Sequence, residues 1–192
     1  LLKKQATGHT TLQSVLPADY DITIQENEWH NLRMTLLDGI LKVYMDDVLL
    51  MTQDESMTHV FYASGGFGLR NSETNGKFDN FKVRGTTSDV YVKQIEPTVY
   101  TDNFDDETAG ENPSHWIETS GKDQWKVYAD GDNKMYGVKG VSGYSDSWLH
   151  GFEEDPVYVA RFKVTSTRDG AQAGFLIRRS SDTAYFRAGY DF

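Results

Sequence analysis

Apolar and polar residues alternate over much of the chain, which is the pattern of half-buried β-strands. Leu32, Met34 and Leu36 occupy every second position after Trp29, and residues 41–45 repeat the alternation. Asp38-Gly39 lies between the two runs and predicts a tight hairpin turn. Two antiparallel strands are therefore expected here.

Further short strands are expected along the rest of the chain. They are the segments at 48–51, 59–63, 66–70, 77–83, 125–130, 133–138, 158–164, 173–179 and 184–192. Asp130-Gly-Asp-Asn133 predicts a hairpin turn, and Ser180 to Thr183 predicts another. No window of ten residues has a period of 3.6, so the sequence predicts an all-β protein made of antiparallel strands.

The order of the segments is unusual. GKFDNFKVRGTTSD, at 76–89, is a strand that passes into small polar residues, as at the end of a domain. YTDNFDDETAGENPSHW, at 100–116, is typical of the beginning of a domain. A segment typical of the end of a domain thus precedes a segment typical of the beginning of one. Residues 86–98 are the only plausible linker between them.

The chain resembles the concanavalin A-like (laminin-G-like) jelly-roll modules of secreted bacterial polysaccharide-degrading enzymes, including the fructan-binding modules of levanases. The segments that carry the resemblance are DNFDDETAGENPSHW, VYVARFKVTS, AGFLIRRSSDTAYFRAGYD, EWHNLRMTLLDGILKVYMDDVLL and GGFGLRNSETNGKFDNFKV. The resemblance implies a two-sheet antiparallel jelly-roll sandwich. It also implies a secreted or cell-surface bacterial protein whose partners are a polysaccharide or oligosaccharide and other domains of a larger chain.

The two halves stand in the reverse of the family order. Residues 1–85 resemble a second half and residues 99–192 a first half, and 86–98 joins them. Either a circular permutation or a cut across two tandem copies would explain this. Each half alone would expose a sheet face and unpaired edges, so we expect them to form one sandwich, within one chain or, less simply, by domain swapping.

A single sandwich formed by both halves leads to two specific predictions. The segment that begins at Tyr100 should pair with residues 77–83, and Phe192 should lie close to Leu1.

Composition narrows the classes of partner. The 192 residues carry 29 acidic and 19 basic side chains, for a formal net charge of -10. Nucleic acid and anionic membrane surfaces are poor partners, because binding to either begins with Lys and Arg neutralising negative charge. The absence of cysteine removes disulfides, thiol nucleophiles and Cys-ligated zinc.

No catalytic pattern occurs in the sequence. Glycosidases of the resembled fold place alternating carboxylates on one strand face, whereas Glu153, Glu154 and Asp155 are consecutive and precede Pro156, which predicts a solvated loop. The five histidines have no ligand spacing. We therefore expect a protein that is not an enzyme.

A structural calcium ion is one expectation for the acidic residues near the linker. Asp102 and Asp105 in the opening strand should lie near Asp79 in the closing strand if the halves combine. Clustered carboxylates repel one another unless a cation compensates, and calcium prefers oxygen ligands. The alternative is a turn with solvated acids.

Candidate sugar-binding residues lie in the second half. Trp148, with Tyr144 four residues earlier, sits in a stretch too polar to be wholly core, so it is a candidate for stacking on a sugar, with an edge-strand core role as the alternative. Arg178, Tyr185 and Arg187 lie on two strands that should be neighbours, with surface ion pairs as the alternative.

The other three tryptophans are weaker candidates. Trp29 and Trp116 are expected to be structural, and the role of Trp125 stays open.

The sequence thus favours a non-catalytic carbohydrate-binding module. The alternative is a structural or interaction domain of a large surface protein that binds no glycan. An exposed cluster of aromatic and Arg side chains on a concave sheet would favour the first function, and a flat, uniformly charged surface would favour the second.

Overall fold

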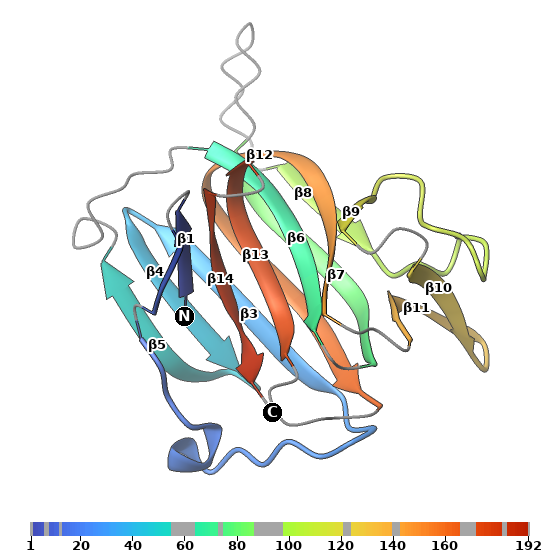
Figure 1. Cartoon of the computed structure of the whole chain (residues 1–192), viewed down its shortest axis with the longest axis horizontal. Coiled ribbons are helices and arrows are strands. Elements are labelled where there is room, and N and C mark those ends of the chain that lie inside the picture. Colours follow the sequence, from blue (N-terminus) through green and yellow to red (C-terminus); the bar gives the residue numbers. More distant parts are fainter. Residues whose placement is uncertain are drawn as a thin grey trace, which may run out of the picture.

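Two antiparallel β-sheets pack face to face as a sandwich (Figure 1). The computed structural model describes residues 2–5, 8–11, 13–54, 64–72, 75–86, 98–120, 124–139, 143–165, 172–181 and 184–191. The expected all-β fold is confirmed, and one 3-10 turn, η1 (Pro17–Tyr20), interrupts the strands of the described part. No helix in these ranges is long and apolar enough to cross a membrane.

The sheet nearer the viewer in Figure 1 is called the front sheet. Its strands, in spatial order, are β9 (Ile117–Ser120), the first half of β12 (Tyr144–Val164), β6 (Ser64–Ser72), β13 (Gln172–Ser181), β14 (Ala184–Asp191), β1 (Leu2–Gln5) and β2 (Gly8–Thr11).

The rear sheet lies behind it. Its strands, in spatial order, are β8 (Thr98–Asp102), β7 (Gly76–Thr86), the second half of β12, β3 (His30–Leu37), β4 (Ile40–Met45) and β5 (Val48–Asp54). A hairpin of β10 (Trp125–Asp130) and β11 (Asn133–Val138) joins this sheet at the start of β7.

The hairpin turns predicted at Asp38-Gly39 and at 130–133 are present. The turn predicted at 180–183 lies partly, and the strand predicted at 59–63 wholly, outside the described residues. Asp38 and Gly39 have φ angles of 50° and 74° between β3 and β4, which is the left-handed backbone that a two-residue turn requires. Asp46 and Asp47 form the next turn with φ angles of 49° and 66°. Gly131, with φ 66°, lies in the turn between β10 and β11.

Strand β12 belongs to both sheets. Its first half pairs with β6, and from Val157 onward it pairs with β7 and β3. At the corner, Glu153 is opposite Ser64 of β6 and Thr86 of β7. The loop expected at 153–156 is therefore wrong: the backbone continues as one strand that changes sheets through a shift in register.

Aromatic rings from both halves of the sequence fill the core between the sheets. Phe67 of the front sheet stacks on Phe81 and Tyr158 of the rear sheet, with ring centroids 4.5 and 4.6 Å apart. Phe175 contacts Phe67 edge-on at 5.1 Å. These four side chains are at most 1% exposed, so they bind the two layers together.

The two halves also share hydrogen-bonded strand pairs. Val83 of β7 is opposite Tyr100 of β8, which confirms the predicted pairing of these segments. In the front sheet β1 pairs with β14, with Leu2 opposite Arg187. Leu1, Phe192 and residues 87–97 of the linker lie outside the described residues, and the origin of the reversed order stays an interpretation.

The hairpin of β1 and β2 was not expected from the sequence. Residues 2–11 contain LKKQATGHTT, in which only Leu2 is a large apolar residue, so no alternation marks these strands.

The front sheet carries a second, smaller apolar cluster on the face that points away from the core. Trp148 on β12 and Leu176 on β13 flank Gly68 on β6, and both are directly opposite it in register. A Cβ atom at Gly68 would lie 2.5 Å from Cε3 of Trp148, so the indole covers this glycine. Arg70 and Asp146 form a buried bidentate ion pair one register step away, at 2.6 and 2.5 Å.

We expect Gly68→Ala to destabilise the protein, because the new methyl group overlaps the Trp148 ring. Overpacking of this kind costs about 1 to 3 kcal/mol, measurable as a lower urea midpoint. In a Trp148→Leu background the same glycine substitution should cost much less, because the smaller side chain leaves room. Equal costs in both backgrounds would contradict the contact.

Candidate functional site

Trp148, the main candidate for sugar stacking, is buried. Its side chain is 1% exposed and packs with Leu176. A ring with so little exposed area offers no face to a sugar in this structure. Its placement supports the core alternative.

The other candidates for sugar binding lie on strands placed as expected. β13 and β14 are antiparallel neighbours, with Leu176 opposite Arg187 and Ile177 opposite Phe186. The side chains of Arg178, Tyr185 and Arg187, and that of Tyr144, lie outside the described part of the structure. A binding site at these residues stays a prediction.

Asp102 holds the segment that follows β8 in place. Its Oδ1 accepts a hydrogen bond from the backbone N–H of Phe104 at 2.9 Å. Its Oδ2 accepts one from Trp116 Nε1 at 2.9 Å and one from the Tyr100 hydroxyl at 3.0 Å. Burial, followed by the charge of Asp102, raises the pKa of Tyr100. The carboxylate therefore anchors two aromatic residues of the core.

Asp105 and Asp79 are also engaged by protein donors. Asp105 Oδ2 accepts from Asn103 at 2.7 Å, and its Oδ1 accepts from the backbone N–H of Lys134 at 3.1 Å. Asp79 is 1% exposed and accepts from the backbone N–H of Asn80 and from Asn133 Nδ2. Burial raises the pKa of Asp79, against the opposing effects of these hydrogen bonds and of the positive charge of Arg161.

A cation of the chain itself lies in this region. Lys134 Nζ donates to the backbone carbonyls of Asp105 at 2.6 Å and Glu107 at 2.7 Å. Within the described ranges, no group of three His, Asp or Glu residues converges as a metal site would require. All three carboxylates thus accept hydrogen bonds from the protein itself, and calcium at Asp79, Asp102 or Asp105 stays an untested prediction.

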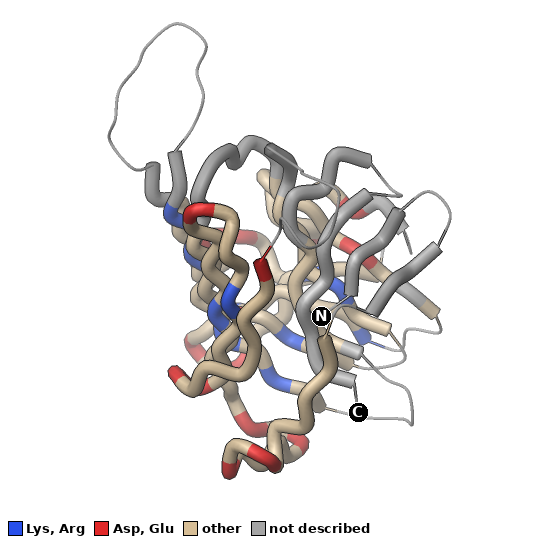
Figure 2. The backbone as a smooth tube through the Cα atoms, turned by 90° about the vertical axis from the view of Figure 1, so that its left-hand side faces the viewer, with Lys and Arg blue, Asp and Glu red and all other residues tan. Residues whose placement is uncertain are grey.

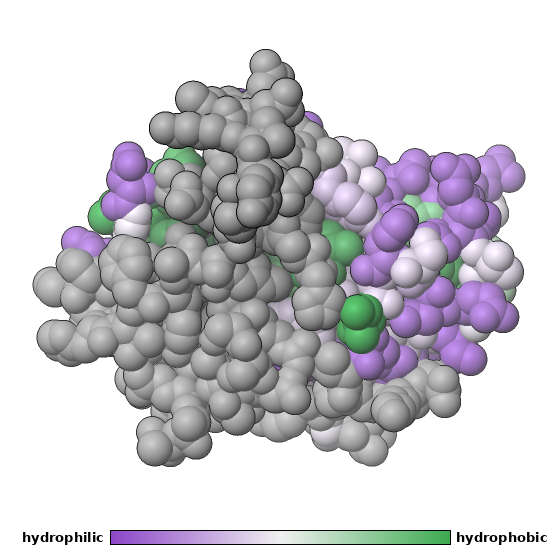
Figure 3. Space-filling view, turned by 90° about the horizontal axis from the view of Figure 1, so that it is seen from above, coloured by the Kyte–Doolittle hydropathy of each residue, from purple (hydrophilic) through white to green (hydrophobic). Residues whose placement is uncertain are grey.

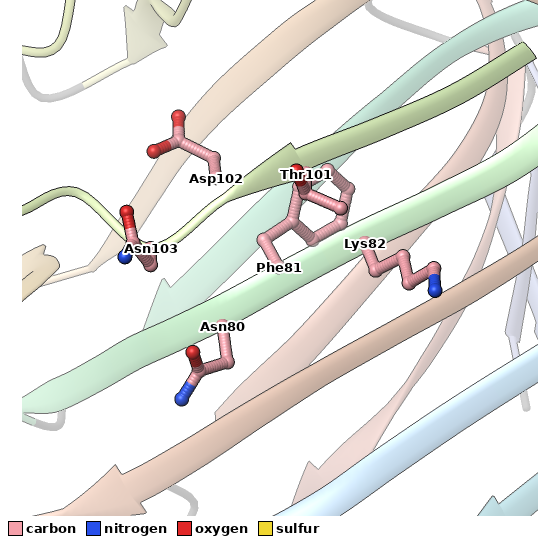
Figure 4. Close-up of a pocket in the computed structure, with 6 residues that line it drawn as sticks. All are labelled: Asn80, Phe81, Lys82, Thr101, Asp102 and Asn103. Atoms are coloured by element: carbon pink, nitrogen blue, oxygen red, sulfur yellow. The ribbon is translucent and has the colours of Figure 1, made fainter.

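A polar groove runs between β7 and the end of β8. It has a volume of about 400 Å³ and is lined by Asn80, Phe81, Lys82, Thr101, Asp102 and Asn103. Figure 4 shows the Asn80 and Asn103 amides on the same side of the groove, with Lys82 extending along β7 in the other direction. Asn80 has a φ of 50° and lies at the shift in register between β7 and β12. A β-bulge thus places Asn80 at the groove, where its Nδ2 donates to Asp79 Oδ2 at 3.2 Å.

The groove continues into the outer face of the rear sheet, which is called the basic face. Residues directly opposite one another in antiparallel strands share a face. One row of this face runs through Thr101, Lys82, Val159, Arg33 and Tyr44.

The next row of the basic face runs through Arg84, Val157, Thr35 and Lys42. Arg161 and Lys163 lie further along β12, at the alternate positions that follow Val159. The interleaved positions, such as Val83 and Tyr158, point into the core. On β3, β4, β7 and β12 the basic face therefore carries six cations, together with Asp79 opposite Arg161. The cations are Arg33, Lys42, Lys82, Arg84, Arg161 and Lys163.

These cations are segregated from most of the acidic residues. Figure 2 shows Lys and Arg along the strands, whereas Asp and Glu gather mainly at the turns. Arg33 is 3.8 Å from Asp47 and Lys163 is 2.8 Å from Asp130, both of which lie at turns. Lys42, Lys82 and Arg84 have no ion-pair partner among the residues that the structure describes.

Two partly exposed aromatic rings belong to the basic face. The guanidinium of Arg33 lies 3.7 Å from the centroid of the Tyr44 ring. Arg161 and Lys163 lie 4.9 and 4.8 Å from the centroid of Trp29. Trp29 was expected to be structural; it precedes β3 and lies at the edge of the basic face.

A second hollow of about 500 Å³ lies at the end of the molecule that carries β9 and β10. Trp116 and Trp125 line it, but they are 2% and 1% exposed, so neither offers a ring face to a ligand. Trp125, whose role the sequence left open, is thus a core residue. Figure 3 shows a mostly hydrophilic surface at this end.

No known protein family matches this chain, and no curated protein matches it.

Lys77 is a buried lysine at the junction of β7 and β11. It is 6% exposed, its Nζ donates to the carbonyl of Val138 at 3.1 Å, and it lies against the Tyr128 ring. Burial, with the like charges of Lys139 and Lys163, lowers its pKa to about 7. The folded state thus favours the neutral amine.

We expect Lys77 to make stability rise with pH. Its pKa is about 10.5 in the unfolded chain and about 7 in the folded protein, so the unfolded state binds more protons between these values. Relative to Lys77→Met, the parent should gain on the order of 3 kcal/mol between pH 7 and pH 10, measured by urea unfolding. Lys126→Met, at a partly exposed position, should show no such difference. Parallel pH curves for the parent and Lys77→Met would contradict this account.

We expect Lys134→Met to lower the melting temperature by a few degrees, because two carbonyls lose a charged donor worth about 1 to 3 kcal/mol. Lys126→Met is the matched control. Calcium at Asp79, Asp102 or Asp105 predicts that millimolar calcium raises the melting temperature of the parent above its value with chelator, and superimposed curves would contradict it. A rise on adding calcium would show that the acids near Asp79 do form a calcium site.

Proposed function

We propose that the protein is a non-catalytic carbohydrate-binding module of a secreted or surface polysaccharide-active protein. The observation that supports this best is the cluster of partly exposed Trp29 and Tyr44 rings with Arg33 and Arg161 on the open outer face of the rear sheet. The non-catalytic part of the proposal rests on the sequence, in which no run of alternating carboxylates occurs.

The chemistry of this face suits a sugar chain. Aromatic rings pack against the CH faces of sugars, and planar guanidinium and amide groups bind hydroxyls and acidic groups. The adjoining groove adds the amides of Asn80 and Asn103 and the hydroxyl of Thr101. A polysaccharide that crosses β7, β12 and β3 would contact both kinds of group.

The alternative, a structural or interaction domain, is supported by a different observation. Lys42, Lys82 and Arg84 form an area of uniform positive charge. The two rows to which they belong contain a single aromatic residue, Tyr44. Such an area also suits an acidic protein surface. Glycan binding separates the two functions.

We expect native gels that contain a bound polysaccharide to slow the migration of the protein. Shallow sites give dissociation constants in the micromolar to millimolar range, which correspond to a binding free energy of about 4 to 8 kcal/mol. The panel is levan, β-glucan, dextran and pectic polymers. Trp29→Ala and Tyr44→Ala should each weaken binding about tenfold, because each removes a ring.

Ile117→Ala is the control, because Ile117 is 49% exposed on β9 of the front sheet. It should bind as the parent does. If Arg178→Gln with Arg187→Gln abolishes binding while Trp29→Ala does not, the site is on the front sheet instead. A parent protein that binds no member of the panel would leave the structural domain as the better function.

A further inference from the structure

The basic face is unexpected in a chain of this charge. The protein has 29 acidic and 19 basic residues, yet six cations occupy one sheet face. The positions between them in the two rows are neutral (Val157, Val159 and Thr35), whereas Arg161 lies opposite the buried Asp79. Cations that face one another across neutral residues repel, so the free protein holds them at a cost that an anionic ligand would relieve.

The spacing of the cations suits an extended chain more than a compact anion. Lys82 and Arg33 lie in one row, two strands apart, and Arg84 and Lys42 lie in the next row, three strands apart. With neighbouring strands about 4.8 Å apart, these separations are about 10 and 14 Å. A single phosphate or carboxylate cannot bridge such distances, whereas a linear polymer with repeated charges can.

From this arrangement we propose that the basic face binds a linear polysaccharide that carries carboxylates, that is, a polyuronate. Carboxylates suit the forked guanidiniums of Arg33, Arg84 and Arg161. Trp29 and Tyr44 contact the sugar rings between the acidic groups. This inference rests on the proposed function and names its ligand class.

The acidic residues beside the basic face favour a single polysaccharide chain over wider polyanions. Nucleic acid duplexes and anionic bilayers present dense charge over a wide area, and the acidic turns at Asp47 and Asp130 beside the basic face would meet that charge. A single polysaccharide chain contacts only the strands beneath it. The acidic rim at Asp47 and Asp130 therefore confines binding to the face.

The test compares polymers that differ only in charge. De-esterified polygalacturonate and its fully methyl-esterified form are incorporated in native gels, at low and at moderate salt. We expect strong retardation by the acidic polymer, at least tenfold weaker retardation by the ester, and loss of the difference as salt screens the carboxylates. Dextran sulfate and duplex DNA are run in parallel and should retard the protein less.

Paired variants locate the site. Lys82→Gln with Arg84→Gln removes two exposed cations that lack partners among the described residues, and should weaken polygalacturonate binding about tenfold. Lys3→Gln with Lys4→Gln changes the net charge equally on β1, a strand of the front sheet, and should bind within about twofold of the parent. Melting curves of both variants verify that they fold.

Each outcome bears on a different statement. Retardation by levan, β-glucan or dextran as strong as that by polygalacturonate overturns the polyuronate but keeps the binding module. Equal retardation by dextran sulfate or DNA shows unspecific polyanion binding and overturns it too. Equal loss in both paired variants overturns the basic face as the site, and no retardation by any polysaccharide overturns the proposed function itself.

Discussion

The change of sheet within β12 is the constraint on which the rest of the structure depends. One continuous strand supplies partners to β6 and β9 in the front sheet and to β7 and β3 in the rear sheet. Because β6 and β7 come from the first half of the sequence and β12 from the second, the bend ties the halves together. The Phe67 cluster then fills the space between the layers that this strand connects. The same register fixes which cations stand in one row on the outer face.

Acidic and basic residues occupy different kinds of backbone position in this protein. Acidic residues occupy turns, where Asp supports left-handed backbone at Asp38, Asp46 and Asp47. Basic residues occupy outward strand positions, where long aliphatic stems can cover apolar neighbours such as Val157 and Val159. An acidic protein can thus present a basic face. Lys77 is an exception among the basic residues, because its burial lowers its pKa to about 7.

Much of the fold could be predicted from alternation and turn chemistry. Leu32, Met34 and Leu36 are buried as expected, and the predicted pairing of residues 77–83 with the segment at Tyr100 is present. The continuity of β12 through Pro156 could not be predicted, because local chemistry there indicates a loop and the sheet change is set by distant partners.

The site was harder to predict than the fold. Trp148 stands in a polar stretch, yet Gly68 on another strand leaves space for its ring, a relation that no local pattern shows. The signal for the basic face was present, however: Arg33, Lys82 and Arg161 all stand at outward positions of predicted strands. What was missing was the strand order that places them side by side.

The pairing of β1 with β14 has a mechanical consequence. Leu2 is opposite Arg187 and Lys4 is opposite Tyr185, so the start of β1 and the end of β14 point the same way along the sheet. Hydrogen bonds in an antiparallel pair run perpendicular to the strands. A tension applied between Leu2 and Asp191 would therefore load these bonds one after another, as in opening a zipper, rather than all together in shear. β1 would peel away at low force, while the core strands beneath it would feel the load only afterwards.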